Sequence, residues 1–283
     1  MHRDRLAAGF FLLCLISGCP QAVQPEAFAP GPPRIVSLDY CADQFVLKFV
    51  APENILALSP DATKHFSYMR DSAKGLPQVR SSAEAVLALQ PTTVVRSYGG
   101  GPYARQFFSA AGVDVVQLDF PADLDAVANN ILKVARQLGV SAKGTALVSE
   151  MEHRLLELQR APRRLPSLYV TPGGVTTGPG SLVHEVLEAA GLSNFELQKG
   201  WRPVPLERLA GSRPDLLVAA SFGQKSAHVD AWTLARHPLM MELMDAVPRV
   251  DIDGAWTSCG GWFLLDAIEA LAQRAAGIED SGL

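Results

Sequence analysis

The sequence predicts an α/β protein with two lobes, each containing a parallel sheet, joined by one long interlobe helix. Short apolar runs alternate with amphipathic segments along most of the chain, which is typical of parallel sheets with helices on both faces. The alternation stops at a helical stretch near the middle of the 283 residues and then restarts. A local sequence unit also occurs once on each side of that stretch. Together these observations predict two related lobes and a connecting helix.

The first segment is typical of an export signal. Arg3 and Arg5 precede an apolar run at 6–16, which is shorter than the roughly 20 residues of a membrane-spanning helix. The run ends in Ile16-Ser17-Gly18-Cys19, which resembles the lipobox of bacterial lipoproteins. We therefore expect residues 1–19 to be a lipoprotein signal peptide that ends at a lipidated Cys19, and residues 20–33 to be a tether. The mature protein would be periplasmic and membrane-anchored; an unlipidated signal cut near Ala27-Phe28-Ala29 is the alternative.

Residues 34–122 are expected to form the N-terminal α/β lobe. The predicted strands are the apolar runs at 34–38, 55–58, 92–95 and 113–118. Helices are expected from Asp39 or Cys41 onward, near 86–89 and at 103–111. A polar loop at 59–75 and a loop with three consecutive glycines at 96–102 separate these elements.

Residues 123–162 are expected to be a helical linker, with helices at 123–138 and 141–159. In the second of these, the interlobe helix, Ser141 is the predicted N-cap, and the residues that recur every three or four positions are Leu147, Met151, Leu155 and Leu158. At about 1.5 Å per residue this helix would extend about 28 Å. The C-terminal α/β lobe, residues 163–283, has predicted strands at 167–170, 216–219 and 250–252 and predicted helices at 182–190, 206–209, 231–237 and 263–276.

The repeated unit consists of a glutamate, a proline seven residues later and then an apolar strand: Glu84 with Pro91, and Glu207 with Pro214. Other distinctive segments are 34–38 with Cys41-Ala42-Asp43, Gly178-Pro179-Gly180-Ser181 and 190–194. In this order they resemble class III (helical-hinge) periplasmic substrate-binding proteins of ABC importers, the group that takes up ferric siderophores, haem and cobalamin. The resemblance covers about 34–276. It implies two Rossmann-like lobes with ligand held in the cleft between them.

The resemblance implies a receptor and not an enzyme. The receptor would capture an iron chelate (siderophore), haem or a corrinoid and deliver it to the permease, without a cofactor of its own. In such proteins a glutamate on each lobe docks onto permease arginines, and Glu84 and Glu207 stand at the matching positions. The alternative for each is a glutamate stabilised by the helix dipole. We expect a monomer that touches the membrane only through its lipid, and the net charge of −4 gives no reason to expect a nucleic-acid partner.

Ligand contacts are expected at the carboxyl ends of the strands, where open α/β sheets bind ligands. The candidates there are aromatic residues that suit a planar or catecholate-bearing ligand, and basic residues that could pair with its carboxylates: His65, Tyr68, Arg96, Tyr98, Trp201, Arg202 and Trp256. For each aromatic residue, packing in the core is the alternative.

Cys41 and Cys259 remain once Cys14 leaves with the signal and Cys19 carries lipid. Three interpretations stay open: a disulfide, two buried thiols, or ligation of a metal or haem-like centre. The second choice of function is accordingly a free metal-ion binding protein that uses Cys41, Cys259 and His65. A third is an exported two-domain α/β enzyme, although no P-loop lysine, HExxH or Gly-x-Ser-x-Gly motif supports catalysis or nucleotide binding.

Overall fold

The first four strands form one parallel sheet in the order β2-β1-β3-β4. The structure is a computed structural model and describes residues 31–158, 164–221 and 237–280. The strands of this sheet are β1 (Ile35–Ser37), β2 (Ile55–Ala57), β3 (Thr93–Arg96) and β4 (Asp114–Gln117). Successive side chains point to opposite faces, so Ile35 and Val36 belong to different apolar cores. The sheet is buried on both faces, as its apolar runs predict.

Helices cover the two faces of this sheet in pairs, and together they make the first lobe. The helices α1 (Tyr40–Phe49) and α4 (Leu124–Gln137) share a core with Ile35. The helices α2 (Ala83–Leu87) and α3 (Ala104–Ala110) share a core with Val36, and a short 3-10 helix, η1 (Pro52–Asn54), precedes β2. Three of these helices begin after a side chain that caps the first turn: Asp39, Ser82 and Asp123.

The second lobe contains another parallel sheet, in the order β10-β9-β5-β7. Its strands are β5 (Leu165–Val170), β7 (Leu192–Asn194), β9 (Leu216–Ser221) and β10 (Arg249–Asp253). The helices of this lobe are α6 (Leu182–Ala189), α7 (Leu206–Gly211), α8 (Pro238–Ala246) and α9 (Leu264–Asp280). An antiparallel pair, β6 (Val175–Thr177) and β8 (Trp201–Pro203), lies beside this sheet, and η3 (Gly254–Trp256) follows β10. Two parallel four-stranded sheets confirm the predicted fold class.

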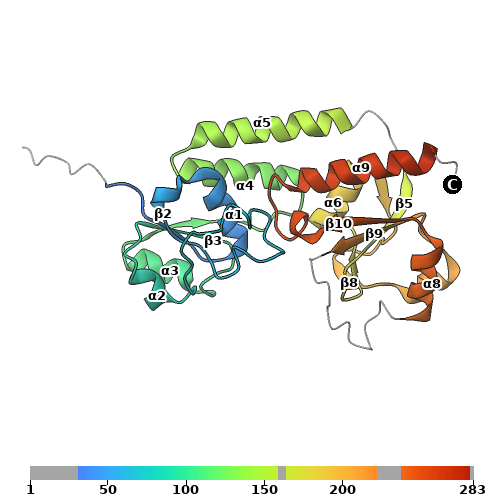
Figure 1. Cartoon of the computed structure of the whole chain (residues 1–283), viewed down its shortest axis with the longest axis horizontal. Coiled ribbons are helices and arrows are strands. Elements are labelled where there is room, and N and C mark those ends of the chain that lie inside the picture. The colour runs from blue at the N-terminus through green and yellow to red at the C-terminus, as the bar shows by residue number, and fades with distance from the viewer. Residues whose placement is uncertain (1–30, 159–163, 222–236, 281–283) are drawn as a thin grey trace, which may run out of the picture. The chain divides into compact units, whose positions relative to one another are not determined.

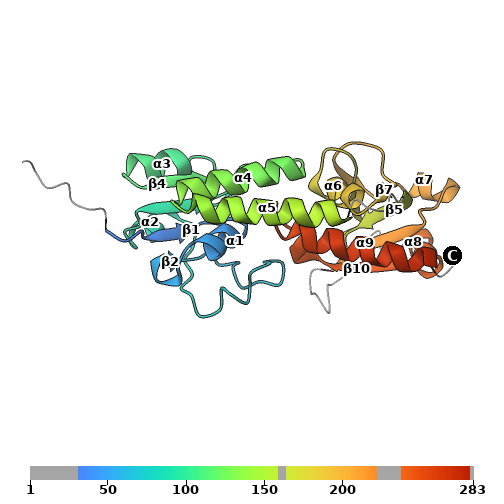
Figure 2. The same cartoon turned by 90° about the horizontal axis from the view of Figure 1, so that it is seen from above.

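The helix α5 (Ser141–Leu158) packs against α4 of the first lobe and α9 of the second, as Figures 1 and 2 show. Gly144 permits the approach to α4, because a Cβ there would lie 2.4 Å from Ala135 Cβ. On the α9 side, Arg154 bonds Asp266 at 2.9 Å and Glu269 at 2.6 Å. Ser141 is the first helical residue and not the cap, because the carbonyl of the preceding residue already accepts helical N–H groups.

Besides the short η1 and η3, three strands and one helix were not predicted from the sequence: β6, β7, β8 and α8. Trp201 and Arg202 consequently lie on a strand, although a loop was expected there. Residues 231–236 of the helix predicted at 231–237, the signal peptide with Cys19 and most of the tether fall outside the described residues. His237 is described and is the N-cap of α8, not part of a helix. In the part of the chain that the structure describes, no helix is long and apolar enough to cross a membrane.

Candidate functional site

A pocket of about 350 Å³ lies where the carboxyl ends of β3 and β4 meet the first turns of α1 and α6. The first lobe contributes 40–41, 97–98 and 118–121, with Asn130 from α4. The second lobe contributes 180–183, Trp201 and 257–260. The site therefore lies between the lobes and at strand ends, as open α/β sheets lead one to expect.

Beside this pocket a disulfide cross-links the two lobes. Cys41, in the first turn of α1, forms a disulfide with Cys259, which precedes α9; their Cα atoms are 5.6 Å apart. Next to the bridge, Gly260 packs on Pro121 so closely that a Cβ on the glycine would lie 2.3 Å from Pro121 Cγ. We call Cys41, Cys259, Pro121 and Gly260 the interlobe seam. Of the three interpretations of the cysteines, the structure has the disulfide.

Aromatic side chains from both lobes line the pocket. Tyr98 is 47% exposed, Phe120 is 75% exposed and Trp201 is 56% exposed, so their ring surfaces are available to a ligand. The ring of Tyr40 meets that of Tyr98 edge-on, with centroids 6.1 Å apart. Burial raises the pKa of both phenols, so both stay uncharged at neutral pH. We call Tyr40, Tyr98, Phe120 and Trp201 the aromatic wall.

The pocket lining carries little charge. Asp119 is its one carboxylate among the described residues, and Lys133 Nζ neutralises it from 2.7 Å away. Within the same ranges the lining holds no arginine, lysine or histidine. Such a surface binds through ring contacts and hydroxyl groups more than through ion pairs.

The sequence from residue 35 to 247 matches the family model described as "Periplasmic binding protein". The chain belongs to the periplasmic binding protein family. It is thus a substrate-binding protein of an importer and not an enzyme, as the sequence predicted. A comparison with curated protein sequences gave no match.

Solved structures of three periplasmic proteins have the same fold as this binding protein. A haem-binding protein from Pseudomonas aeruginosa is 24% identical, with a TM-score of 0.68 over 86% of this chain and 92% of that one. For the haem-binding protein HutB of Vibrio cholerae the values are 18% identity, a TM-score of 0.71, and coverage of 86% and 98%. The vitamin B12-binding protein BtuF of Vibrio cholerae is 16% identical, with a TM-score of 0.63 over 85% of this chain and 95% of that one.

Two of the seven predicted ligand contacts of this binding protein, Tyr98 and Trp201, line the pocket. Arg96 does not, because its guanidinium is buried and donates to the carbonyls of Gly99 and Gly101 at 2.8 and 3.0 Å. Arg202 is held by the carboxylate of Glu196, 3.7 Å away, and by the side chain of Gln198. Trp256 lies on η3 against the apolar core and is not part of the lining.

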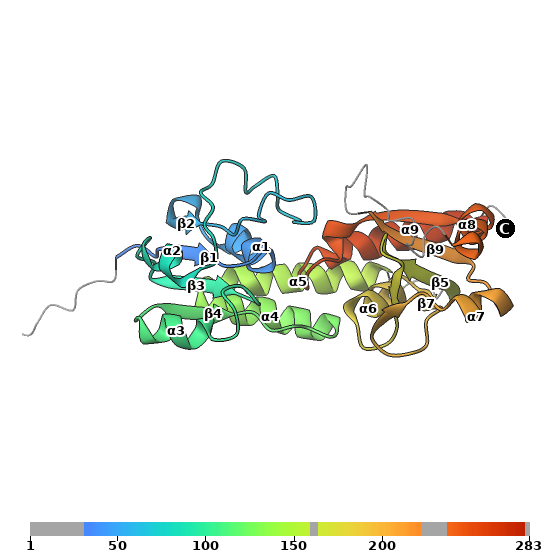
Figure 3. The same cartoon turned by 90° about the horizontal axis from the view of Figure 1, so that it is seen from below.

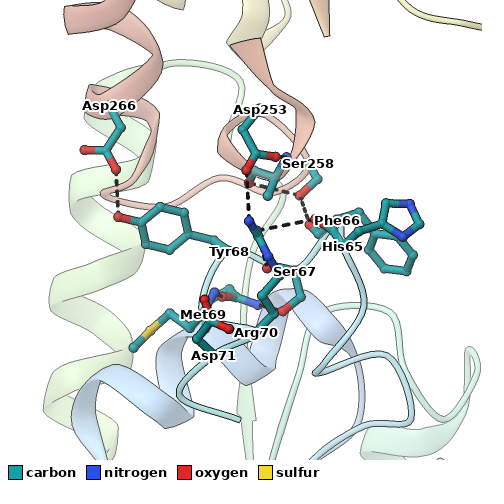
Figure 4. A network of polar contacts seen from close by, with 12 residues as sticks. His65, Phe66, Ser67, Tyr68, Met69, Arg70, Asp71, Asp253, Ser258 and Asp266 are labelled. Atoms are coloured by element: carbon teal, nitrogen blue, oxygen red, sulfur yellow. Dashed lines mark hydrogen bonds and ion pairs between the residues drawn. The ribbon is translucent and has the colours of Figure 1, made fainter. Parts of the chain in front are cut away.

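His65 and Tyr68 lie on the segment after β2, which Figure 3 shows reaching towards the second lobe. Figure 4 shows its contacts: Tyr68 Oη donates to Asp266 at 2.7 Å, Arg70 pairs with Asp253 at 3.1 Å, and Ser258 Oγ donates to the carbonyl of Phe66 at 2.7 Å. Burial, with the bond to Asp266, raises the pKa of Tyr68 to about 12. In addition to the seam, this segment, residues 65–70, is a noncovalent brace between the lobes. Neither His65 nor Tyr68 lines the pocket.

The alternative metal set of Cys41, Cys259 and His65 is wrong, since both sulfur atoms are bonded to each other. Among the described residues no group of three or more His, Cys, Asp or Glu side chains is placed to hold a metal ion.

Sequence reasoning missed Tyr40 and Phe120. Tyr40 follows β1 and Phe120 follows β4, so the rule that ligands bind at strand ends would have found both if applied to all four strands of the first sheet.

Proposed function

We propose that this protein binds a planar or macrocyclic metal chelate, haem or a corrinoid, against the aromatic wall and delivers it to the permease of an ABC importer. The observation that carries the proposal is a pocket between the lobes with aromatic side chains from both and no basic side chain among its described lining residues. Rings stack well on a macrocycle and gain from burying it. Haem-binding and vitamin B12-binding relatives of the same fold support this choice of ligand.

An anionic ferric siderophore, the third ligand class expected from the sequence, fits the described lining less well. Arginine and lysine side chains pair most strongly with anionic groups such as carboxylates and catecholates, and a tris-catecholate siderophore carries more of them than haem, which has only two propionates. Arg96 and Arg202, the two that were expected to supply them, have partners within the protein.

The test is a titration of the mature protein with haemin, cyanocobalamin and ferric enterobactin, followed by absorbance and by native mass spectrometry. We expect one of the first two to bind tightly, and Tyr98→Ala and Trp201→Ala to weaken it by roughly tenfold each, about 1.4 kcal/mol. Tyr103→Ala is the matched control, because Tyr103 is 74% exposed and lies outside the lining. Tight binding of ferric enterobactin alone, or of bare metal ions alone, would overturn the proposal.

Delivery would use Glu84 and Glu207 as the docking residues. Both are exposed and lie in the first turn of a helix, α2 in the first lobe and α7 in the second. Two carboxylates on different lobes would orient the protein on basic pockets of the permease. The double variant Glu84→Ala/Glu207→Ala should keep its affinity for ligand and lose uptake, whereas Glu53→Ala/Glu150→Ala, which removes the same charge from other exposed sites, should retain both. Normal uptake by the first double variant would refute the assignment.

Lipid anchoring at Cys19 would keep the receptor near its permease. A single acyl modification site suffices to concentrate a periplasmic receptor at a membrane if the cysteine carries more than one chain. Cys19→Ser should move the protein from the membrane fraction to the soluble fraction. A variant that stays in the membrane fraction would show that something other than this cysteine holds it there.

A further inference from the structure

Asp39 is a buried carboxylate close to the pocket that does not itself line it. It is 3% exposed and immediately precedes α1. Its Oδ1 accepts hydrogen bonds from the Ala42 amide and from Ser97 Oγ, both at 2.9 Å. Its Oδ2 accepts three consecutive backbone amides, those of Ser97, Tyr98 and Gly99, at 2.7, 3.1 and 2.9 Å. Five hydrogen bonds converge on one side chain.

Capping of α1 accounts for only one of these bonds. Asp123, which caps α4, accepts one such bond within the described residues, from the Ala126 amide at 2.7 Å. An N-cap needs one side-chain oxygen. The second oxygen of Asp39 instead holds the chain where it leaves β3, 58 to 60 residues further along the sequence. The carboxylate therefore ties two segments together.

Each of those two segments carries one tyrosine of the aromatic wall. Tyr40 is next to Asp39 in the chain, and the amide of Tyr98 is one of the three that Asp39 accepts. The same loop is also fixed from its carbonyl side, since Arg96 donates to the carbonyls of Gly99 and Gly101. A Cβ at Gly99 would lie 2.2 Å from the carbonyl oxygen of Leu38, so the loop lies directly on the end of β1.

We propose that Asp39 is a positioning residue for the ligand site, which sets Tyr40 and Tyr98 relative to each other before ligand arrives. The proposal rests on the proposed function, because it takes the aromatic wall as the ligand contact. The side chain of Tyr98 is half-exposed, but its backbone is held by a carboxylate in a set of converging amides. A wall whose backbone is fixed in this way loses less conformational entropy on binding than a loop that must first be ordered.

Asp39→Ser separates positioning from capping. Serine is as good an N-cap as aspartate and can accept the Ala42 amide. Its single hydroxyl oxygen cannot also take the three amides of 97–99. Asp123→Ser is the matched control, since it exchanges one capping side chain for another that, in the part of the chain described, bonds only its own helix. Asp39→Asn keeps one oxygen for the three amides, and its NH₂ group, in the place of Oδ1, can donate to Ser97 Oγ but cannot accept the Ala42 amide. It should therefore recover most of the protection of the 97–99 amides that the serine variant loses, without capping α1.

The full mature protein should be compared by hydrogen exchange with mass spectrometry and by titration with haemin and with cyanocobalamin. In Asp39→Ser we expect the amides of 97–99 to exchange at least about tenfold faster, while those of α1 keep their protection. Binding of whichever probe the wild type takes should weaken roughly tenfold. Asp123→Ser should match the wild type in both measurements.

The proposal is overturned if Asp39→Ser leaves the exchange of 97–99 and the affinity unchanged. It is also overturned if the loop amides of Asp39→Ser exchange faster but the affinity stays at the wild-type value. Loss of protection along all of α1 would overturn it too, because that result would show that Asp39 acts only as the cap of α1. A wild-type protein that binds neither probe would refute the proposed function. In that case, the positioning role would still be supported if the amides of 97–99 alone exchanged faster in Asp39→Ser and returned to slow exchange in Asp39→Asn. If the amides of 97–99 did not exchange faster in Asp39→Ser, the positioning role would be refuted.

Discussion

Removal of the interlobe disulfide should destabilise the protein more than loss of any single noncovalent contact. The perturbation is the double variant Cys41→Ser/Cys259→Ser, because a single substitution would leave a free thiol able to pair with another molecule. The bridge joins residues 218 positions apart, so it closes most of the folded chain into one loop. For a loop of this length the chain-entropy relation gives about 5 kcal/mol at 25 °C.

Residual structure in the unfolded chain makes that figure an upper value, because a compact unfolded state already brings distant residues together. We therefore expect the double variant to lose about 3–5 kcal/mol of unfolding free energy. For a protein of this size each kcal/mol moves the Tm by about 2–4 °C, which corresponds to a fall of roughly 6–20 °C.

Guanidinium unfolding of the mature protein would measure this loss, with wild type and double variant each studied with and without a thiol reductant. The reductant should lower the stability of the wild type to near that of the variant and leave the variant unchanged. A loss below about 1 kcal/mol would contradict the loop-closure argument, since surface substitutions away from such constraints have effects of that size. A reductant effect on the variant would show that something other than this bridge is being reduced.

Three further predictions concern the buried carboxylate of Asp43, Gly260 of the seam and the closure of the lobes. Burial raises the pKa of Asp43 from 3.8 to about 6. Between about pH 4 and pH 6 the native state therefore binds more protons than the unfolded state. As pH rises through that window, ionisation of Asp43 lowers the free energy of unfolding by up to about 3 kcal/mol. Asp43→Asn, which can still bond Ser59, should match the wild type in urea unfolding at pH 4 and exceed it at pH 7; a pH-independent difference would contradict this. Gly260→Ala should cost about 1–3 kcal/mol because its Cβ meets Pro121, whereas Gly277→Ala on α9, with open space around it, should be neutral or stabilising in the same denaturation assay. Closure on ligand binding should be modest, so a large change in the radius of gyration by solution scattering would be evidence against two fixed connections between the lobes.

The sheets were predictable because their strands are nearly continuous apolar runs bounded by turn residues. Seven of the eight strands in the two parallel sheets overlap the predicted apolar runs, and β7 is the one that does not. The capping residues Asp39 and Asp123 also carried a local signal, a short polar side chain directly before a helical apolar pattern.

The antiparallel pair β6 and β8 could not be predicted by periodicity, because each strand has three residues and Pro203 lies in one of them. The helix α8 begins at Pro238, and proline is common in the first turn of a helix. Its apolar residues do not recur at clear helical spacing, so the helix was not predicted. These elements are set by pairing and packing between segments that are separated in the sequence.

The site was predictable in its location but only partly in its residues. The strand-end rule predicted Tyr98 at the pocket, and Tyr98 does line it. The same rule predicted Arg96 there, but the loop after β3 folds back and its carbonyls accept hydrogen bonds from the guanidinium. The disulfide could not be decided from the sequence either. A bridge needs Cα atoms within about 7 Å, and that approach depends on how two lobes pack.

The helix α5 and the contacts beside the pocket connect the lobes and constrain the pocket in different ways. The helix α5 fixes the spacing of the lobes along its length, through Gly144 against α4 and Arg154 against α9. A helix alone would still permit rotation about its own axis. The seam and the brace at 65–70 oppose that rotation, because they fasten a second line of contact next to the pocket. The fold therefore holds the aromatic wall in place. Glu84 and Glu207 lie on different lobes, so a permease that bound both could favour a more open arrangement of the lobes. The disulfide would limit that opening. We therefore expect the release of ligand to depend on how far the disulfide permits the two sides of the pocket to separate.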